Sequence, residues 1–192
     1  MPELLVLGGD TAAEHHVRQL TRALGPGSIR VVSSNWTEAI REWVPRAAPE
    51  DQLVPAPTMP HLLWEWLGTE LGATPGPVPR GWRLPFEAPG PAGEVYLSAA
   101  AWTCPATCVE PGHCPALHAP RDWDLADLIE ERALELGYTP IVFRVSHYAA
   151  GVASIPASAL QAARHAAGLR LLVATSSRCH AAVGVLLRTL TG

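Results

Sequence analysis

The sequence of 192 residues contains no lysine, so all 14 of its basic residues are arginine. This absence excludes Schiff-base chemistry and the lysine of a phosphate-binding P-loop. Any bound anion must be held by arginine, by backbone N–H groups or by helix N-termini. Because arginine codons are GC-rich and lysine codons are not, we attribute the bias to base composition.

Blocks of basic charge and long apolar runs are also missing. The formal net charge is −4 and the acidic residues are scattered, so we expect no nucleic-acid partner. No stretch approaches the ~20 apolar residues of a membrane helix, and we expect no membrane partner. The first residues are acidic and Leu4–Leu7 is too short for a signal peptide. We therefore expect a cytoplasmic protein with a small-molecule or redox partner, in an oligomeric state that the sequence leaves open.

Apolar periodicity predicts six strands that alternate with six helices. The predicted strands are Leu4–Leu7, Ile29–Val32, Gln52–Val54, Glu94–Leu97, Pro140–Val145 and Leu169–Ala174. The predicted helices cover 13–24, 36–44, 63–71 with a cap at Thr58, 125–136 with a cap at Asp122, 157–167 and 178–190.

This alternation predicts a three-layer, Rossmann-like α/β fold around a mostly parallel sheet of about six strands. We also expect a Pro/Gly-rich loop at 72–93 and a cysteine-rich metal loop. The chain is interpreted as a single domain over 1–192, with possible halves 1–71 and 94–192.

The strongest chemical signal is a cluster of three cysteines, at Cys104, Cys108 and Cys114, with a fourth at Cys179. In a cytoplasmic protein, cysteines are more often metal ligands or redox groups than disulfides. Four thiolates satisfy a tetrahedral zinc ion or an iron–sulfur cluster. The alternatives are thiol-redox groups without metal, and a chance cluster of buried cysteines.

The predicted topology brings the two sources of thiol together. Cys104 follows the fourth predicted strand and Cys179 follows the sixth, so both lie at the carboxyl edge of a parallel sheet, where ligands bind. A helix beginning at 178 would lower the pKa of the Cys179 thiol.

The cysteine spacing favours a cluster over a single ion. The C-x3-C-x5-C pattern with a distant fourth cysteine fits paired zinc knuckles poorly, and proline follows Cys104 and Cys114 as in bacterial ferredoxin runs. We expect an iron–sulfur cluster of the 4Fe–4S type, with zinc as the alternative and His113 and His180 as alternate ligands. The predicted function is redox chemistry or substrate activation as an oxidoreductase. The alternative is a zinc-stapled, non-catalytic module for small-ligand binding or regulation.

A second signal is the turn Gly8-Gly9-Asp10 after the first strand. Glycine permits close approach to a phosphate, and a helix N-terminus favours anions. On this turn, residues 3–71 resemble the dinucleotide-binding half of Rossmann proteins, including the NAD-binding-like regulatory domains of potassium transport. The resemblance implies a nucleotide at Gly8, Gly9 and Asp10; the alternative is a turn that serves only strand-to-helix geometry.

Two further strand ends carry polar side chains. Ser177 and Arg178 are predicted to form an anion-binding nest, with Arg178 as its cation. His147 is a candidate general acid or base because histidine titrates near neutral pH. The alternative for both is a solvated loop.

Overall fold

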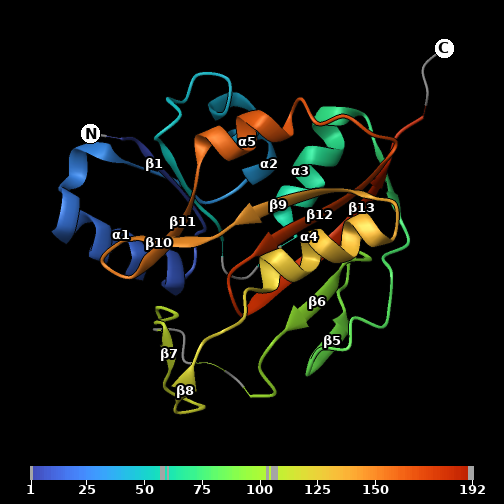
Figure 1. Ribbon diagram of the computed structural model, residues 1–192. Helices are drawn as coiled ribbons and strands as arrows, with labels where there is room; N and C mark the ends of the chain where they lie inside the picture. Colours follow the sequence, from blue (N-terminus) through green and yellow to red (C-terminus); the bar gives the residue numbers. More distant parts are fainter. Residues whose placement is uncertain (1, 57–58, 60, 103, 105–107, 190–192) are drawn as a thin grey trace.

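The computed structural model describes residues 2–56, 59, 61–102, 104 and 108–189 (Figure 1). Its strands form two mixed sheets and one small ribbon. The first sheet has the order β10 (Ser146–Ala149), β11 (Val152–Pro156), β3 (Gln52–Val54), β1 (Leu4–Leu7), β2 (Ile29–Val32). The second has the order β5 (Phe86–Pro89), β6 (Val95–Ser98), β13 (His180–Leu187), β12 (Arg170–Ser176), β9 (Thr139–Arg144), and β4 (Thr74–Gly76) also pairs with β13. The ribbon pairs β7 (His113–Cys114) with β8 (Ala119–Pro120).

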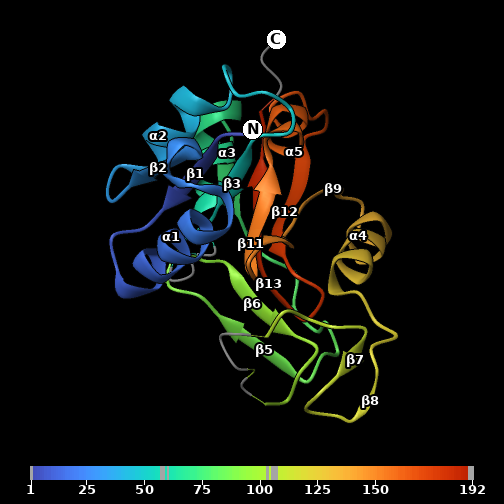
Figure 2. The same cartoon turned by 90° about the vertical axis from the view of Figure 1, so that its left-hand side faces the viewer.

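The helices cover both sheets. They are α1 (Thr11–Leu24), α2 (Trp36–Trp43), α3 (Leu62–Leu71), α4 (Leu125–Glu135) and α5 (Ala157–Ala163), and a short 3-10 turn, η1 (Pro26–Ser28), follows α1. The largest apolar cluster joins α2, α3 and α5 to strands of both sheets. A second cluster packs α4 against the opposite face of β12 and β13, and a third packs α1 against β1. Figure 2 shows α4 on one side of the second sheet and α2 and α3 on the other.

The prediction of a mostly parallel, Rossmann-like sheet is wrong. Only β1 with β2, β1 with β3, and β9 with β12 pair in parallel; the other paired strands of the described residues are antiparallel. The main cause is the segment predicted as a helix over 178–190, which instead forms β13 and pairs with β12 along seven residues. A side chain at Gly184 would lie 2.5 Å from the Trp64 ring, so close strand-to-helix packing depends on this glycine.

Two hairpin strands and two short strands also differ from prediction. The segment 146–156 forms the β10–β11 hairpin, which turns at Gly151 with a positive φ of 76°. The predicted loop at 72–93 contains β4 and β5. Asp124, not Asp122, caps α4 by accepting from the Ala126 N–H at 3.0 Å. The predicted cap at Thr58 lies outside the described residues.

The second sheet determines where the cysteines lie. Both β6 and β12 run antiparallel to β13, which lies between them, so β6 and β12 point the same way. Their carboxyl ends therefore meet at one edge of the sheet. The chain leaves β6 toward Cys104 there, and it turns from β12 into β13 through Cys179.

Candidate functional site

Three segments that are distant in sequence meet at this edge. The Ala99 N–H, just after β6, donates to the Cys179 carbonyl at 2.9 Å. The Leu125 N–H, at the start of α4, donates to the Arg178 carbonyl at 3.0 Å. The end of β6, the loop 104–124 and the β12–β13 turn thus form one site.

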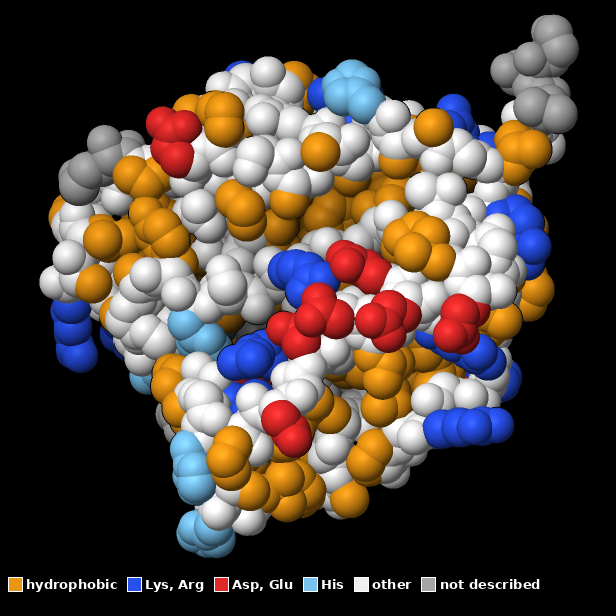
Figure 3. All heavy atoms as spheres, viewed as in Figure 1, with side chains coloured by type: hydrophobic (Ala, Val, Ile, Leu, Met, Phe, Trp, Pro, Cys, Tyr) orange, Lys and Arg blue, Asp and Glu red, His pale blue; other side chains and the backbone are white. Residues whose placement is uncertain are grey.

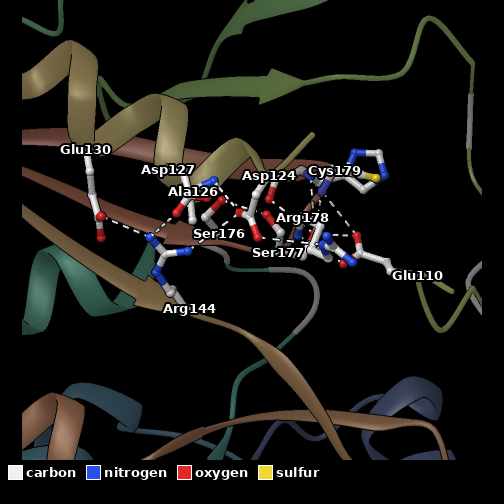
Figure 4. Close-up of polar contacts among 11 residues, drawn as sticks. Glu110, Asp124, Ala126, Asp127, Glu130, Arg144, Ser176, Ser177, Arg178 and Cys179 are labelled. Atoms are coloured by element: carbon white, nitrogen blue, oxygen red, sulfur yellow. Dashed lines mark hydrogen bonds and ion pairs between the residues drawn. The ribbon is translucent and has the colours of Figure 1, made fainter. Parts of the chain in front are cut away.

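Glu110 holds the cysteine loop on the β12–β13 turn (Figure 4). Its carboxylate accepts from the Ser177 hydroxyl at 2.7 Å, from the Arg178 N–H at 2.9 Å and from the Cys179 N–H at 3.3 Å. Glu110 has a positive φ of 47°, which costs a non-glycine residue backbone energy. We call the contact of Glu110 with Ser177, Arg178 and Cys179 the Glu110 latch.

Cys104 lies close enough to the thiols of Cys108, Cys114 and Cys179 to interact with them electrostatically. Burial raises the pKa of the Cys104 thiol, and the nearby thiols of Cys108 and Cys114 raise it further. Burial also raises the pKa of the Cys179 thiol, and Glu110 and Cys104 add to this effect. Cys114 and Cys179 are each 3% exposed, whereas Cys104 and Cys108 are half-buried. The expectation that a helix N-terminus lowers the pKa of Cys179 is wrong, because the residue lies in a hairpin turn.

N–H groups face three of the four sulfurs. The backbone N–H groups of Leu117 and Ala116, together with the Arg121 side chain, lower the pKa of the Cys114 thiol against the effect of burial. The Trp102 indole acts in the same direction on the pKa of Cys104, and the Trp123 indole on that of Cys179, although burial prevails at both. Both indole nitrogens are buried without a partner in full hydrogen-bond geometry. These donors are therefore placed to stabilise an anionic sulfur.

The described residues do not contain a ready-made site for a single ion. Among them, no group of three His, Cys, Asp or Glu side chains is placed to hold a metal ion. The prediction of a cysteine-rich metal loop as a formed element of the fold is therefore wrong for the residues that the structure describes.

The comparisons with known proteins give one match. Residues 59–189, more than half of the chain, match the model of the family AF_1314_C, described as "Uncharacterized protein, C-terminal domain". The chain belongs to this family. No curated protein and no solved structure matches it.

The AF_1314_C match contains the whole site, since it includes all four cysteines, the Glu110 latch and β13. It also corrects the predicted resemblance of residues 3–71 to Rossmann-type, potassium-transport regulatory domains, because the matched family is a different one. The topology agrees with this correction. In a Rossmann half the second strand lies between the first and the third, whereas here β1 lies between β2 and β3.

Of the predicted site residues, Ser177 and Arg178 join the four cysteines. Both contact Glu110, and the Arg178 Nε lies 3.6 Å from Asp124. The predicted alternate ligands His113 and His180 are exposed, on β7 and β13.

The other predicted site residues lie in the first sheet. Gly8 and Gly9 permit tight packing, since a side chain at Gly8 would lie 2.7 Å from the Ala13 Cβ and one at Gly9 would lie 3.0 Å from the Ser33 Cβ. Asp10 caps α1 by accepting from the Ala13 N–H at 2.8 Å. These contacts show that the turn serves strand-to-helix packing, and they leave the predicted nucleotide site as a prediction. His147 is exposed on β10.

Sequence reasoning missed Glu110, Arg121 and the two tryptophans near the thiols. The positions of Trp102, two residues before Cys104, and of Glu110, within the cysteine cluster, were the available signals. An ionic cluster on α4 was missed as well: Arg144 contacts Asp127 at 2.6 Å and Glu130 at 2.9 Å. Figure 3 shows the acidic side chains gathered over α4 beside arginine.

None of the helices in the described part of the chain has the length and apolar character needed to cross a bilayer.

Proposed function

We propose that this protein binds an iron–sulfur cluster through Cys104, Cys108, Cys114 and Cys179 and uses it in redox chemistry. The observation that carries the proposal is the Glu110 latch, which ties the loop that carries Cys108 and Cys114 to the turn that carries Cys179. Two of the four cysteines are buried and none is in a disulfide. A free, buried cysteine need not have a function, but contact between two cysteine-bearing segments 65 residues apart supports a shared role.

The surroundings of the sulfurs support thiolate ligands. Metal binding requires the deprotonated thiolate, which buried N–H donors stabilise. Such donors near Cys104, Cys114 and Cys179 come from two indoles, two backbone groups and one guanidinium. Hydrogen bonds to the sulfurs are also among the features that set the potential of an iron–sulfur centre.

The pattern of ligands favours a cluster over a zinc staple. Structural zinc sites are usually built from paired knuckles with two to four intervening residues. Here the second gap, from Cys108 to Cys114, has five residues, and the fourth thiol comes from a β-hairpin turn. If all four thiols bind, the cluster is fully coordinated, which suits electron transfer better than activation of a substrate at an open iron.

A surface position suits a redox partner. Cys104 and Cys108 are half-buried, so this side of the centre is closer to solvent than the side at Cys114 and Cys179. We propose that a small-molecule or protein redox partner approaches on the Cys104 and Cys108 side.

The test is anaerobic purification and reconstitution of the full chain, with iron, sulfide and zinc assays and visible and EPR spectra. We expect about four iron and four sulfide per chain for a 4Fe–4S cluster, and loss of colour in the Cys104→Ser, Cys114→Ser and Cys179→Ser variants. Val109→Ser is the matched control, because Val109 is exposed in the same loop and supplies no thiol. A protein that takes up zinc but no iron would support the zinc-stapled module and refute the cluster.

A further inference from the structure

A cavity of about 410 Å³ lies between the start of α2 and the second half of α3. Its volume falls in the range of pockets that take small organic ligands, roughly 300–1,000 Å³. Asn35, Glu38 and Arg41 form an exposed rim on the α2 side. On the α3 side the lining includes Trp66, which is fully buried. Figure 2 shows α2 and the β7–β8 ribbon at opposite ends of the molecule, so this cavity is separate from the cysteine site.

The beginning of α2 supplies unsatisfied N–H groups beside the cavity. The N–H groups in the first turn of a helix have no acceptor within the helix. The Asn35 side chain caps none of them, and its backbone, with a φ of 53°, is far from the extended conformation of a usual N-cap residue. Residues 36–38 line the cavity, and no hydrogen bond among the described residues satisfies their N–H groups. Together with the positive end of the helix dipole, these groups favour an anion.

Two tryptophans line the cavity, and they differ in their hydrogen bonds. Trp36 Nε1 donates to the Val32 carbonyl at 3.0 Å, which fixes the start of α2 against the end of β2. Trp66 is 0% exposed, and its Nε1 has no acceptor among the residues that the structure describes. A buried donor without an acceptor destabilises the fold, because nothing replaces its hydrogen bonds with water. A ligand oxygen would supply the acceptor that Trp66 lacks.

The rim adds one cation to these donors. Arg41 is the only basic residue that lines the cavity in the described part of the chain, and its Nη1 lies 3.6 Å from the Glu38 carboxylate. Both side chains are 54% exposed, so this ion pair is weak and leaves guanidinium N–H groups free for a ligand. A guanidinium matches the planar, two-oxygen shape of a carboxylate. The indole rings offer flat apolar surface beside it.

We propose that this cavity binds a small aromatic carboxylic acid. Its carboxylate accepts from the first-turn N–H groups of α2, from Arg41 and from Trp66 Nε1, and its ring lies against Trp36. The two oxygens of a carboxylate have enough lone pairs for these donors. A dianion such as phosphate fits less well, because Glu38 stands at the rim and much of the lining is indole. None of the four cysteines takes part, so this inference is independent of the proposed iron–sulfur cluster.

The test is titration of the full chain with phenylacetate, followed by proton–nitrogen correlation NMR of the indole groups. We expect a saturable shift of the Trp66 indole signal with a Kd on the order of 1 mM or below. The Trp82 indole should not move, because it donates to the Pro79 carbonyl and belongs to another apolar cluster. Trp66→Phe assigns the signal; sequential assignment of the parent replaces this variant if it does not fold. A Trp66 signal that stays in place at ten times that concentration overturns the proposal.

Matched ligands and variants identify the groups that bind. Phenylacetamide has the same ring without the charge and should bind about tenfold more weakly. Arg41→Gln should bind phenylacetate about fivefold more weakly, whereas Arg46→Gln, an exposed position just after α2 and outside the lining, should match the parent. Equal binding of phenylacetamide would refute an anion site, and unchanged binding by Arg41→Gln would exclude this cavity as the place of binding. Displacement of phenylacetate by inorganic phosphate at equal concentration would refute the aromatic acid as ligand.

Discussion

Replacing Glu110 with alanine removes the Glu110 latch, and the cost of this change follows from the structure. The two short contacts, with Ser177 at 2.7 Å and the Arg178 N–H at 2.9 Å, are hydrogen bonds to a charged acceptor. Such bonds contribute about 1.5–3 kcal/mol each when protected from water. Because Glu110 is only half-buried, we take the low end and discount it further for solvent. The third contact, with Cys179 at 3.3 Å, adds little.

We therefore expect Glu110→Ala to lower the free energy of unfolding by about 2 kcal/mol. For a chain of this size this corresponds to about 4–8 °C in Tm. Urea denaturation followed by tryptophan fluorescence measures the change, and the two indoles near the thiols report on the site itself. Glu110→Gln keeps one carbonyl oxygen as acceptor but loses the charge, so we expect it to lower the free energy of unfolding by about half as much as Glu110→Ala.

A carboxylate outside the site serves as the control for Glu110→Ala. Glu42 is an exposed carboxylate on α2, and Glu42→Ala should change the free energy of unfolding by less than about 0.5 kcal/mol. The latch also positions Cys179, so Glu110→Ala should reduce metal uptake on reconstitution. If Glu110→Ala matched the parent in both stability and metal content, the reasoning from these hydrogen bonds would be wrong.

Three further predictions concern the rest of the fold. Gly8→Ala should lower the free energy of unfolding by about 1–3 kcal/mol, because the φ of Gly8 is 134° and the new Cβ would meet Ala13. Gly27 lies in open space, so Gly27→Ala should change the free energy of unfolding little, and thermal unfolding compares the two variants. Arg144→Ala should lower the free energy of unfolding by about 1 kcal/mol at low salt and by less in 1 M NaCl, because salt screens its exposed ion pairs. Urea titrations of parent and variant at both salt concentrations measure this loss, and an equal loss at both would contradict the prediction. Burial and the Glu94 hydrogen bond raise the pKa of Tyr96 to about 12, above the ordinary value of about 10, so its contribution to stability is complete below pH 10 and is lost as pH rises toward 12. Tyr96→Phe should flatten this fall in a series of urea titrations at alkaline pH, and an equally steep fall in the variant would exclude Tyr96 as its source.

The periodic pattern predicted the five α-helices of the described chain and six of its thirteen strands, and it misread the C-terminal part. Segments such as Leu4–Leu7 and Leu125–Glu135 have one dominant period and clear end signals, and they form as expected. The segment 180–187 is a short, alanine-rich apolar run, which suits either a helix or a buried strand. This segment forms a strand because it pairs with β12 on one side and β6 on the other, and because Gly184 leaves space for the Trp64 ring. None of these neighbours is visible in local sequence.

The cysteines were predictable as a group, while the residues that organise them were not. Thiols carry their chemistry in their identity, so a count and a spacing suffice to select them. Glu110 matters because a loop with a positive φ places its carboxylate on a distant hairpin, and Arg121 is buried in the same loop, where its Nη1 donates to the Pro111 carbonyl. An isolated glutamate or arginine in a polar loop has no sequence signature for such a role.

The placement of Cys179 on the last hairpin has a consequence for synthesis of the chain. Three thiols leave the ribosome early, in a loop that has little to hold it until the β12–β13 turn is made. The fourth thiol and the partners of Glu110 come with residues 177–179, which are made after the other three thiols. The Glu110 latch can therefore form only after β12 and the turn that follows it have been made. A chain that ends with β12 keeps three of its cysteines and lacks Cys179.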